Sequence, residues 1–389
     1  MTFKPNSKKE LIEAVNIYYK NKDDGIIKYG IIGDWDVSLI SDMSCLFCEK
    51  QHFNYDISNW NVSNVVNMSK MFTYCSKFNR PLNKWNVSNV VNMENMFSFC
   101  YKFNQPLSEW DVSNVVNMTK MFAKCWQFNQ PLDNWNVSNV VNMKKMFSFC
   151  YKFNQSLNIW NVSNVVNMEH MFGSCENFNQ PLNDWNVSNV DNLSRMFSEC
   201  IYFNHSLNNW NVSKVVNLEN MFYNCYNFNQ PLNNWNVSKV KYIEFMFYNC
   251  NYFDQSLNSW DISNVSIMKG MFYNCSKFNQ PLNNWDVSNV IRIEYMFNDC
   301  KGFNQLLNNW NTSSVINMGS MFKNCVNFNK PLDKWNVSKV TDMKEMFYNC
   351  KKFNKCLDDW KLDNLKECNN VMDGCDKYTF NKIQIQTTS

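Results

Sequence analysis

Hydrophobic and polar residues follow one pattern that repeats every 25 positions along the chain. Tryptophan marks it most clearly, because it stands at one repeat position fourteen times without an insertion or deletion. These residues are Trp35, Trp60, Trp85, Trp110, Trp135, Trp160, Trp185, Trp210, Trp235, Trp260, Trp285, Trp310, Trp335 and Trp360. A unit of 25 residues is too small to bury its own apolar face. The pattern therefore predicts stacked units that share one core.

Two periodicities alternate within each repeat, as the segment 78–103 illustrates. Leu82, Trp85 and Val87 have the spacing L-x-x-L-x-L of a leucine-rich repeat, and the last two face one side of an extended segment. Beyond Ser88, a candidate helix cap, apolar residues are 3, 3, 1, 3 and 3 positions apart, which indicates one stripe of a short helix. The predicted fold class is an α/β solenoid, a leucine-rich-repeat-like array of about fourteen coils, each a short parallel strand plus a short helix.

The two ends of the chain break the repeat and define the predicted organisation. Residues 1–34 contain an amphipathic cap helix over Lys8–Lys20 and a lead-in segment with a glycine-containing turn. Residues 35–359 form the repeat solenoid, 360–380 a degenerate C-terminal capping coil and 381–389 a mobile tail.

Asparagine and cysteine also recur at fixed repeat positions. The ladder of Asn79, Asn104, Asn129 and Asn154 is expected to satisfy backbone groups of turns. Thirteen of the seventeen cysteines, from Cys75 through Cys375, close the apolar stripe and are expected to be reduced core residues. A metal or redox site at the lone C-x-x-C pair, Cys45 and Cys48, is the weaker alternative.

Composition and motifs exclude several classes of function. The net charge of +3 in 389 residues argues against a dedicated nucleic-acid binder. The sequence contains no run of 18 apolar residues, so it predicts no membrane-spanning helix. His52, His170 and His205 stand at unrelated repeat positions and do not match the spacing of a catalytic triad or zinc site. The sequence therefore predicts no enzyme, no cofactor and no metal.

One family shares this repeat. The string WNVSNVVNMxxMFxxCxxFNQPLNxW resembles the 25-residue repeat of BspA-type leucine-rich-repeat surface proteins, a repeat also found in mycoplasma surface lipoproteins. The resemblance covers Lys8 to Tyr378. It implies a surface-displayed array linked to adhesion and protein–protein contact, and it supplies no catalytic residues.

Two compartments fit the sequence. The N-terminal residues lack the apolar stretch of a conventional signal peptide, and many reduced cysteines fit a cytoplasmic or virion location. The alternative is a cell surface reached by unconventional export.

Aromatic residues outside the tryptophan ladder are the candidate partner-binding residues. They are Tyr223, Tyr248, Tyr273, Trp126, Tyr101 and Tyr151. Exposed aromatic side chains commonly anchor interfaces, although each of these can instead pack over its own coil. The predicted function is a non-enzymatic scaffold that binds another protein of unknown identity, with self-association possible. The alternative is a structural or adhesin-like component of a cell surface or virus particle.

Overall fold

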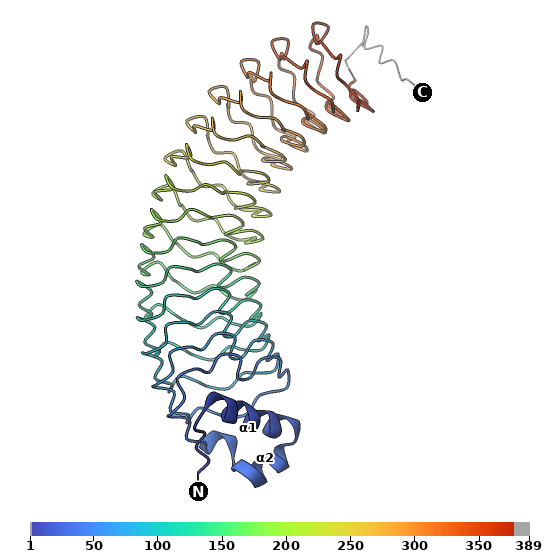
Figure 1. The fold of residues 1–389 in the computed structure, drawn as a ribbon. Helices are drawn as coiled ribbons and strands as arrows, with labels where there is room; N and C mark the ends of the chain where they lie inside the picture. Colours follow the sequence, from blue (N-terminus) through green and yellow to red (C-terminus); the bar gives the residue numbers. More distant parts are fainter. Residues whose placement is uncertain (1, 377–389) are drawn as a thin grey trace. The chain divides into compact units, whose positions relative to one another are not determined.

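The structure is a computed structural model that describes residues 2–376. The chain divides into two compact units, unit 1 (Met1–His205) and unit 2 (Ser206–Ser389). Within each unit the chain forms stacked coils, one for each 25-residue repeat, which confirms a repeat solenoid (Figure 1). The predicted mobile tail, 381–389, and the end of the predicted capping coil lie outside the described residues.

The predicted cap helix is confirmed as α1 (Lys8–Lys20) at the N-terminal end of unit 1 (Figure 1). The Ser7 side chain accepts a hydrogen bond from the Glu10 amide, so the helix begins where a side-chain oxygen satisfies a free N–H group. Leu11, Ala14, Val15 and Tyr18 form its buried face. The helix therefore covers the first coil with an apolar stripe.

A second helix, α2 (Lys22–Tyr29), lies where a glycine-containing turn was expected, and a 3₁₀ turn, η1 (Ile32–Asp34), follows it. Asn21 caps α2 by accepting from the amides of Asp23 and Asp24. Gly25 permits close contact with α1, since a Cβ atom there would lie 2.6 Å from Tyr18 Cα. Asn21 as a cap, followed by Asp23 and Asp24 in the first turn, is a sequence signal for a helix that the spacing of apolar residues did not indicate.

The coils differ from the prediction in local structure. Within the described residues, neither a strand nor an α-helix forms in the repeats; the only strand-like pairing is an isolated parallel bridge between neighbouring coils, such as Asn92 with Asn117. Met93 and Phe97 donate their N–H groups to the next coil, to Asn117 O at 3.0 Å and Met121 O at 2.9 Å. Between them, the Met96 amide donates to Met93 O within the coil. In an α-helix all backbone N–H groups donate to carbonyl groups of the same helix. Here they donate in turn to the same coil and to the next one, so this segment is not an α-helix.

Two residues per coil have positive φ, which an α-helix does not allow. In one coil they are Asn95 (φ 55°) and Phe99 (φ 64°), each the third residue of a turn closed by a backbone hydrogen bond. Positive φ at that place is typical of a type II turn. In unit 2 asparagine, which tolerates this conformation, takes the second position at Asn224, Asn249, Asn274, Asn324 and Asn349. Consecutive turns thus produce the three-residue apolar spacing that suggested a helix.

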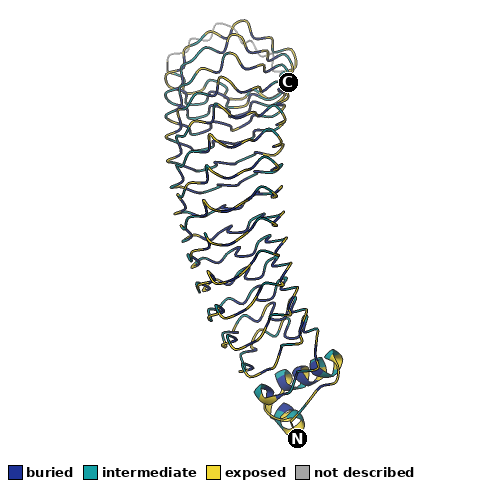
Figure 2. Ribbon diagram, turned by 90° about the vertical axis from the view of Figure 1, so that its left-hand side faces the viewer, coloured by how far each residue is buried: buried dark blue, intermediate teal, exposed yellow. Residues whose placement is uncertain are grey.

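The tryptophan ladder joins the coils through the core. Trp135 is 3% exposed, and its ring stacks on that of Trp160 with centroids 6.4 Å apart. Its indole N–H donates to Leu107 O in the preceding coil at 2.9 Å. That carbonyl also accepts the Trp110 amide, so one oxygen closes a turn and binds the neighbouring coil. Figure 2 shows the resulting recurrence of buried positions from coil to coil.

The asparagine ladder has its predicted role. The backbone N–H of Asn104 donates to Asn79 Oδ1, that of Asn129 to Asn104 Oδ1 and that of Asn154 to Asn129 Oδ1, at 2.9–3.0 Å. Each side chain therefore satisfies a backbone donor of the next coil, which confirms the prediction.

Ser88 is not a helix cap. Its amide and hydroxyl both donate to Asn86 Oδ1, at 3.1 and 2.7 Å, so the asparagine side chain closes the turn. The Ser88 carbonyl accepts from Asn114 Nδ2 of the next coil at 2.7 Å.

The seventeen cysteines form no disulfide within residues 2–376, and the repeated ones from Cys75 to Cys350 are buried. The Cys100 thiol donates to Phe72 O of the preceding coil at 3.0 Å, a contact repeated along each unit. Burial raises the pKa of Cys100 well above its usual value, so the thiol keeps the proton it donates. The reduced core role is confirmed for the twelve cysteines from Cys75 to Cys350, with a hydrogen bond that the sequence did not reveal, whereas Cys375 is half-buried.

Replacing Trp135 by Phe tests the indole contact. We expect a loss of about 2 kcal/mol in the free energy of unfolding, because the variant loses the bond to Leu107 O and leaves a small cavity. Urea unfolding followed by circular dichroism measures this change. The control is Trp126→Phe at a position 38% exposed, for which a change under about 0.5 kcal/mol is expected. Equal losses for both variants would show that the ladder is not a main source of stability.

Candidate functional site

Three of the candidate aromatic residues lie together in unit 1. They occupy the repeat position directly after the buried cysteine in successive coils. Tyr101 and Trp126 stack with ring centroids 4.0 Å apart, and Tyr151 lies 6.2 Å beyond Trp126. Trp126 is 38% exposed, whereas the two tyrosines are half-buried. The rings therefore form one partly exposed row.

A second row, which sequence reasoning missed, lies two positions earlier in the same coils. Tyr74 and Phe99 stack at 4.1 Å, and Lys124 Nζ lies 4.5 Å from the centroid of Phe99 and 5.4 Å from that of Phe149. These are cation–π distances. Phe99 also meets Tyr101 edge-on at 6.3 Å, which joins the rows. We call the whole set the aromatic–lysine surface; it comprises Tyr74, Phe99, Tyr101, Lys124, Trp126, Phe149 and Tyr151.

Turn geometry fixes the spacing of this surface. Phe99 is the third residue of a turn closed by the Cys100 amide and Phe97 O at 2.9 Å. Its own amide donates to Ala123 O of the next coil at 2.8 Å, and the Tyr74 amide makes the equivalent bond to Ser98 O at 2.9 Å. Neighbouring rings are thereby held at the spacing of the coils. The signal in the sequence was an aromatic residue at one repeat position in Tyr74, Phe99 and Phe149.

The other three candidates form a separate stack in unit 2. Tyr223 and Tyr248 lie 4.5 Å apart with an interplanar angle of 7°, and Tyr248 and Tyr273 lie 4.5 Å apart with an angle of 13°. All three are half-buried. Burial, and then the neighbouring Tyr248, raises the pKa of Tyr273 above its usual value. We call Tyr223, Tyr248 and Tyr273 the tyrosine stack; its side chains are aromatic and uncharged.

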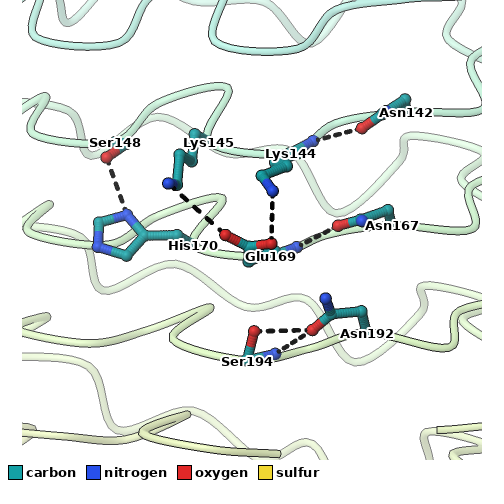
Figure 3. A network of polar contacts seen from close by, with 9 residues as sticks. All are labelled: Asn142, Lys144, Lys145, Ser148, Asn167, Glu169, His170, Asn192 and Ser194. Carbon is teal, nitrogen blue, oxygen red and sulfur yellow. Dashed lines mark hydrogen bonds and ion pairs between the residues drawn. The ribbon is translucent and has the colours of Figure 1, made fainter. Parts of the chain in front are cut away.

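Figure 3 shows a polar network, which adjoins the aromatic–lysine surface where the ring centroids of His170 and Phe149 lie 5.7 Å apart. Lys144 and Lys145 pair with Glu169 at 2.7 and 3.6 Å. Burial acts to raise the pKa of Glu169, but its two lysine partners hold it below the usual value. In the same network Ser148 Oγ lies 2.8 Å from His170 Nδ1. Burial, with a smaller effect of Lys145, lowers the pKa of His170 to about 4, so its ring is neutral at pH 7.

The serine–histidine pair resembles part of a catalytic triad in spacing, but Ser148 is 2% exposed. A nucleophile must be reached by its substrate, so this hydroxyl is placed for a structural hydrogen bond. The sequence did not suggest this pair, because the two residues are 22 positions apart and meet only across neighbouring coils.

Cys45 and Cys48 were the weaker candidates for a metal or redox site. Cys45 is exposed and Cys48 half-buried, and burial together with Cys45 raises the pKa of Cys48 to about 11. A high pKa disfavours the thiolate, which is the reactive and metal-binding form. Across residues 2–376 no group of three or more His, Cys, Asp or Glu side chains is arranged to hold a metal ion.

An open groove crosses the coils of unit 1. Its lining consists of Asn64, Val66, Asn89, Val91, Asn114, Val116, Asn139 and Val141. The valines are 40–44% exposed, while the amide of Asn114 is held by Ser88 O. The groove therefore has an apolar floor between fixed polar side chains. No helix among the described residues has the length and apolar character of a membrane span.

Comparison with known proteins gives one strong match. The family model described as "Mycoplasma protein of unknown function, DUF285" matches residues 16–133, 102–209, 175–285 and 267–385, and so covers most of the chain. No curated protein matches the sequence.

Solved structures of leucine-rich-repeat proteins are similar at low levels. A leucine rich cell surface protein from Faecalibacterium prausnitzii A2-165 shares 16% identity over 75% of this chain and 82% of its own, with a TM-score of 0.41. The APL1 leucine-rich repeat domain shares 9% over 78% and 80%, with a TM-score of 0.22. A leucine-rich-repeat protein of Leptospira interrogans shares 9% over 73% and 80%, with a TM-score of 0.18.

Replacing His170 by Asn tests the half-buried neutral histidine. Its folded pKa of about 4 lies below the unfolded value of 6.5, so the neutral ring stabilises the fold above pH 6.5, and this contribution is lost as the pH falls toward 4. We expect wild type to lose about 2 kcal/mol relative to the variant between pH 7.5 and pH 5.0. Urea unfolding at pH 7.5, 6.0 and 5.0 measures the difference. The control is His52→Asn at an exposed position; parallel pH profiles for wild type and His170→Asn would contradict the assignment.

Proposed function

The chain belongs to the DUF285 family, described as Mycoplasma protein of unknown function, and from this premise we propose that it is a non-enzymatic scaffold that binds another protein. Binding uses the aromatic–lysine surface of unit 1, with the tyrosine stack of unit 2 as a second contact surface. The observation that carries the proposal is the partly exposed row of Tyr101, Trp126 and Tyr151.

Aromatic side chains held in fixed positions are effective interface anchors. They bury a large area and lose little conformational entropy when a partner binds. Here the turns already fix the rings, as the backbone bond of Phe99 to the next coil shows. The surface is thus organised before binding, which lowers the entropic cost of association.

The resemblance to BspA-type surface proteins supports the same proposal. The arrays of that family are surface-displayed and linked to adhesion and protein–protein contact. We extend this role to the chain as an interaction scaffold; the compartment in which it works belongs to the same proposal.

A structural role is the second candidate, because the last described coil is less covered than the others. Leu365, Val371 and Met372 are half-buried, whereas Val340 and Phe347 at equivalent positions in the preceding coil are fully buried. Half-buried apolar side chains of this kind provide a surface for contact with a second copy of the chain in a cell-surface or particle assembly.

Affinity capture with two triple variants tests the scaffold. One carries Tyr101→Ser, Trp126→Ser and Tyr151→Ser, and the other Tyr223→Ser, Tyr248→Ser and Tyr273→Ser. We expect the first variant to lose most of a reproducible partner that wild type captures, measured by quantitative mass spectrometry, because several anchors are removed together.

The control for this capture is a variant with Tyr202→Ser and Tyr252→Ser, which are 55% and 58% exposed but lie outside both surfaces. Light scattering of purified wild type provides the second readout. Recovery of the same proteins with every variant, or recovery of the chain only as its own oligomer, would contradict the scaffold and favour the structural role.

A further inference from the structure

Positive charge is concentrated on four neighbouring coils of unit 1. The segments 69–77, 94–102, 119–127 and 144–152 contain eight lysines and one glutamate, a formal charge of +7, although the whole chain carries only +3. The lysines are Lys70, Lys77, Lys102, Lys120, Lys124, Lys144, Lys145 and Lys152. The next equivalent segment, 169–177, has two glutamates and no lysine, so the concentration has a defined end.

These segments also carry the aromatic–lysine surface, so the charges and the rings lie in the same segments of successive coils. Lys70, Lys77, Lys102 and Lys152 are exposed. Lys144 and Lys145 are partly neutralised by Glu169. The four exposed lysines form no ion pair within residues 2–376. Their charge is therefore available to an anionic partner.

The state of the ring faces distinguishes between classes of anionic partner. Single-stranded nucleic acids bind by stacking bases on open aromatic faces. Here Tyr74 and Phe99 stack on each other, as do Tyr101 and Trp126, and Lys124 lies between Phe99 and Phe149. At least one face of each of these five rings is thus covered, which leaves fewer open faces for base stacking. Ring edges carry partial positive charge and favour carboxylates and apolar side chains.

We infer that the aromatic–lysine surface and its flanking lysines bind an acidic, extended segment of a protein partner. Carboxylates of the segment pair with lysines on successive coils, and its apolar side chains contact the ring edges. With a coil spacing of about 5 Å, four coils span about 15 Å, which matches about five residues of extended peptide. This inference rests on the proposed scaffold function and names the chemistry of the partner.

The test uses a fluorescein-labelled peptide of sequence (Asp-Ser-Glu-Leu)₃ and full-length protein. A matched peptide with Asn and Gln in place of Asp and Glu is the neutral control. We expect saturable binding of the acidic peptide by fluorescence anisotropy at 50 mM salt, and weaker binding at 300 mM salt because exposed charges are then screened. The neutral peptide should not bind.

A pair of charge-matched variants locates the site. Lys77→Gln, Lys102→Gln and Lys152→Gln remove three exposed charges from unit 1, and about tenfold weaker binding is expected. The control variant carries Lys277→Gln, Lys351→Gln and Lys352→Gln, three exposed lysines of unit 2, and should bind within about twofold of wild type. Circular dichroism checks that both variants are folded.

Four results overturn the inference: no binding of the acidic peptide, equal binding of the neutral peptide, equal weakening by both variants, or tighter binding of a 20-nucleotide oligothymidylate. The lysine variant is also used in the capture experiment. If it retains a partner that the Tyr101, Trp126 and Tyr151 variant loses, the scaffold stands and the acidic partner is excluded. If no variant changes capture, the scaffold itself fails.

Discussion

Within each unit, neighbouring coils of this protein depend on one another for backbone hydrogen bonds. N–H groups alternate between a turn inside the coil and a carbonyl of the next coil, as Met96 and Phe97 show. The tryptophan indole, the cysteine thiol and the ladder asparagine add bonds to the preceding coil. Because buried polar groups must be paired, this arrangement holds each coil in one register. It also explains why the repeat length does not vary.

Strict requirements inside the coils leave functional variation to the outward positions. The position of Phe99 is occupied by Lys124 in the next coil and by asparagine in most of unit 2, although all share a positive φ. The backbone therefore presents different side chains at a constant spacing. Unit 1 uses this freedom for a basic aromatic surface and unit 2 for a stack of tyrosines. Two distinct contact surfaces thus arise from one repeat.

The sequence predicted the repeat architecture, α1 and the asparagine ladder, and it singled out Tyr101, Trp126 and Tyr151 as candidates without predicting that their rings lie side by side. It did not distinguish turns from a helix, because apolar residues three positions apart fit both structures. Phe99 and Lys124 are also not residue types that indicate a positive φ. The cap residue Asn21 and the acidic residues Asp23 and Asp24 are sequence signals for the start of helix α2, although the glycine within it suggested a turn. The contact of Ser148 with His170 required the register between coils, which periodicity alone does not give.

Amide hydrogen exchange at the end of unit 2 tests most directly whether coils depend on their neighbours. The amides of Met343, Glu345, Phe347 and Asn349 donate to the last described coil at 2.6–2.9 Å. The equivalent amides of that last coil, those of Cys368, Asn370, Met372 and Gly374, have no backbone acceptor within residues 2–376. We expect strong protection for the first set and rapid exchange for the second, measured by mass spectrometry or NMR. Equal exchange rates in the two sets would contradict the dependence of each coil on the next.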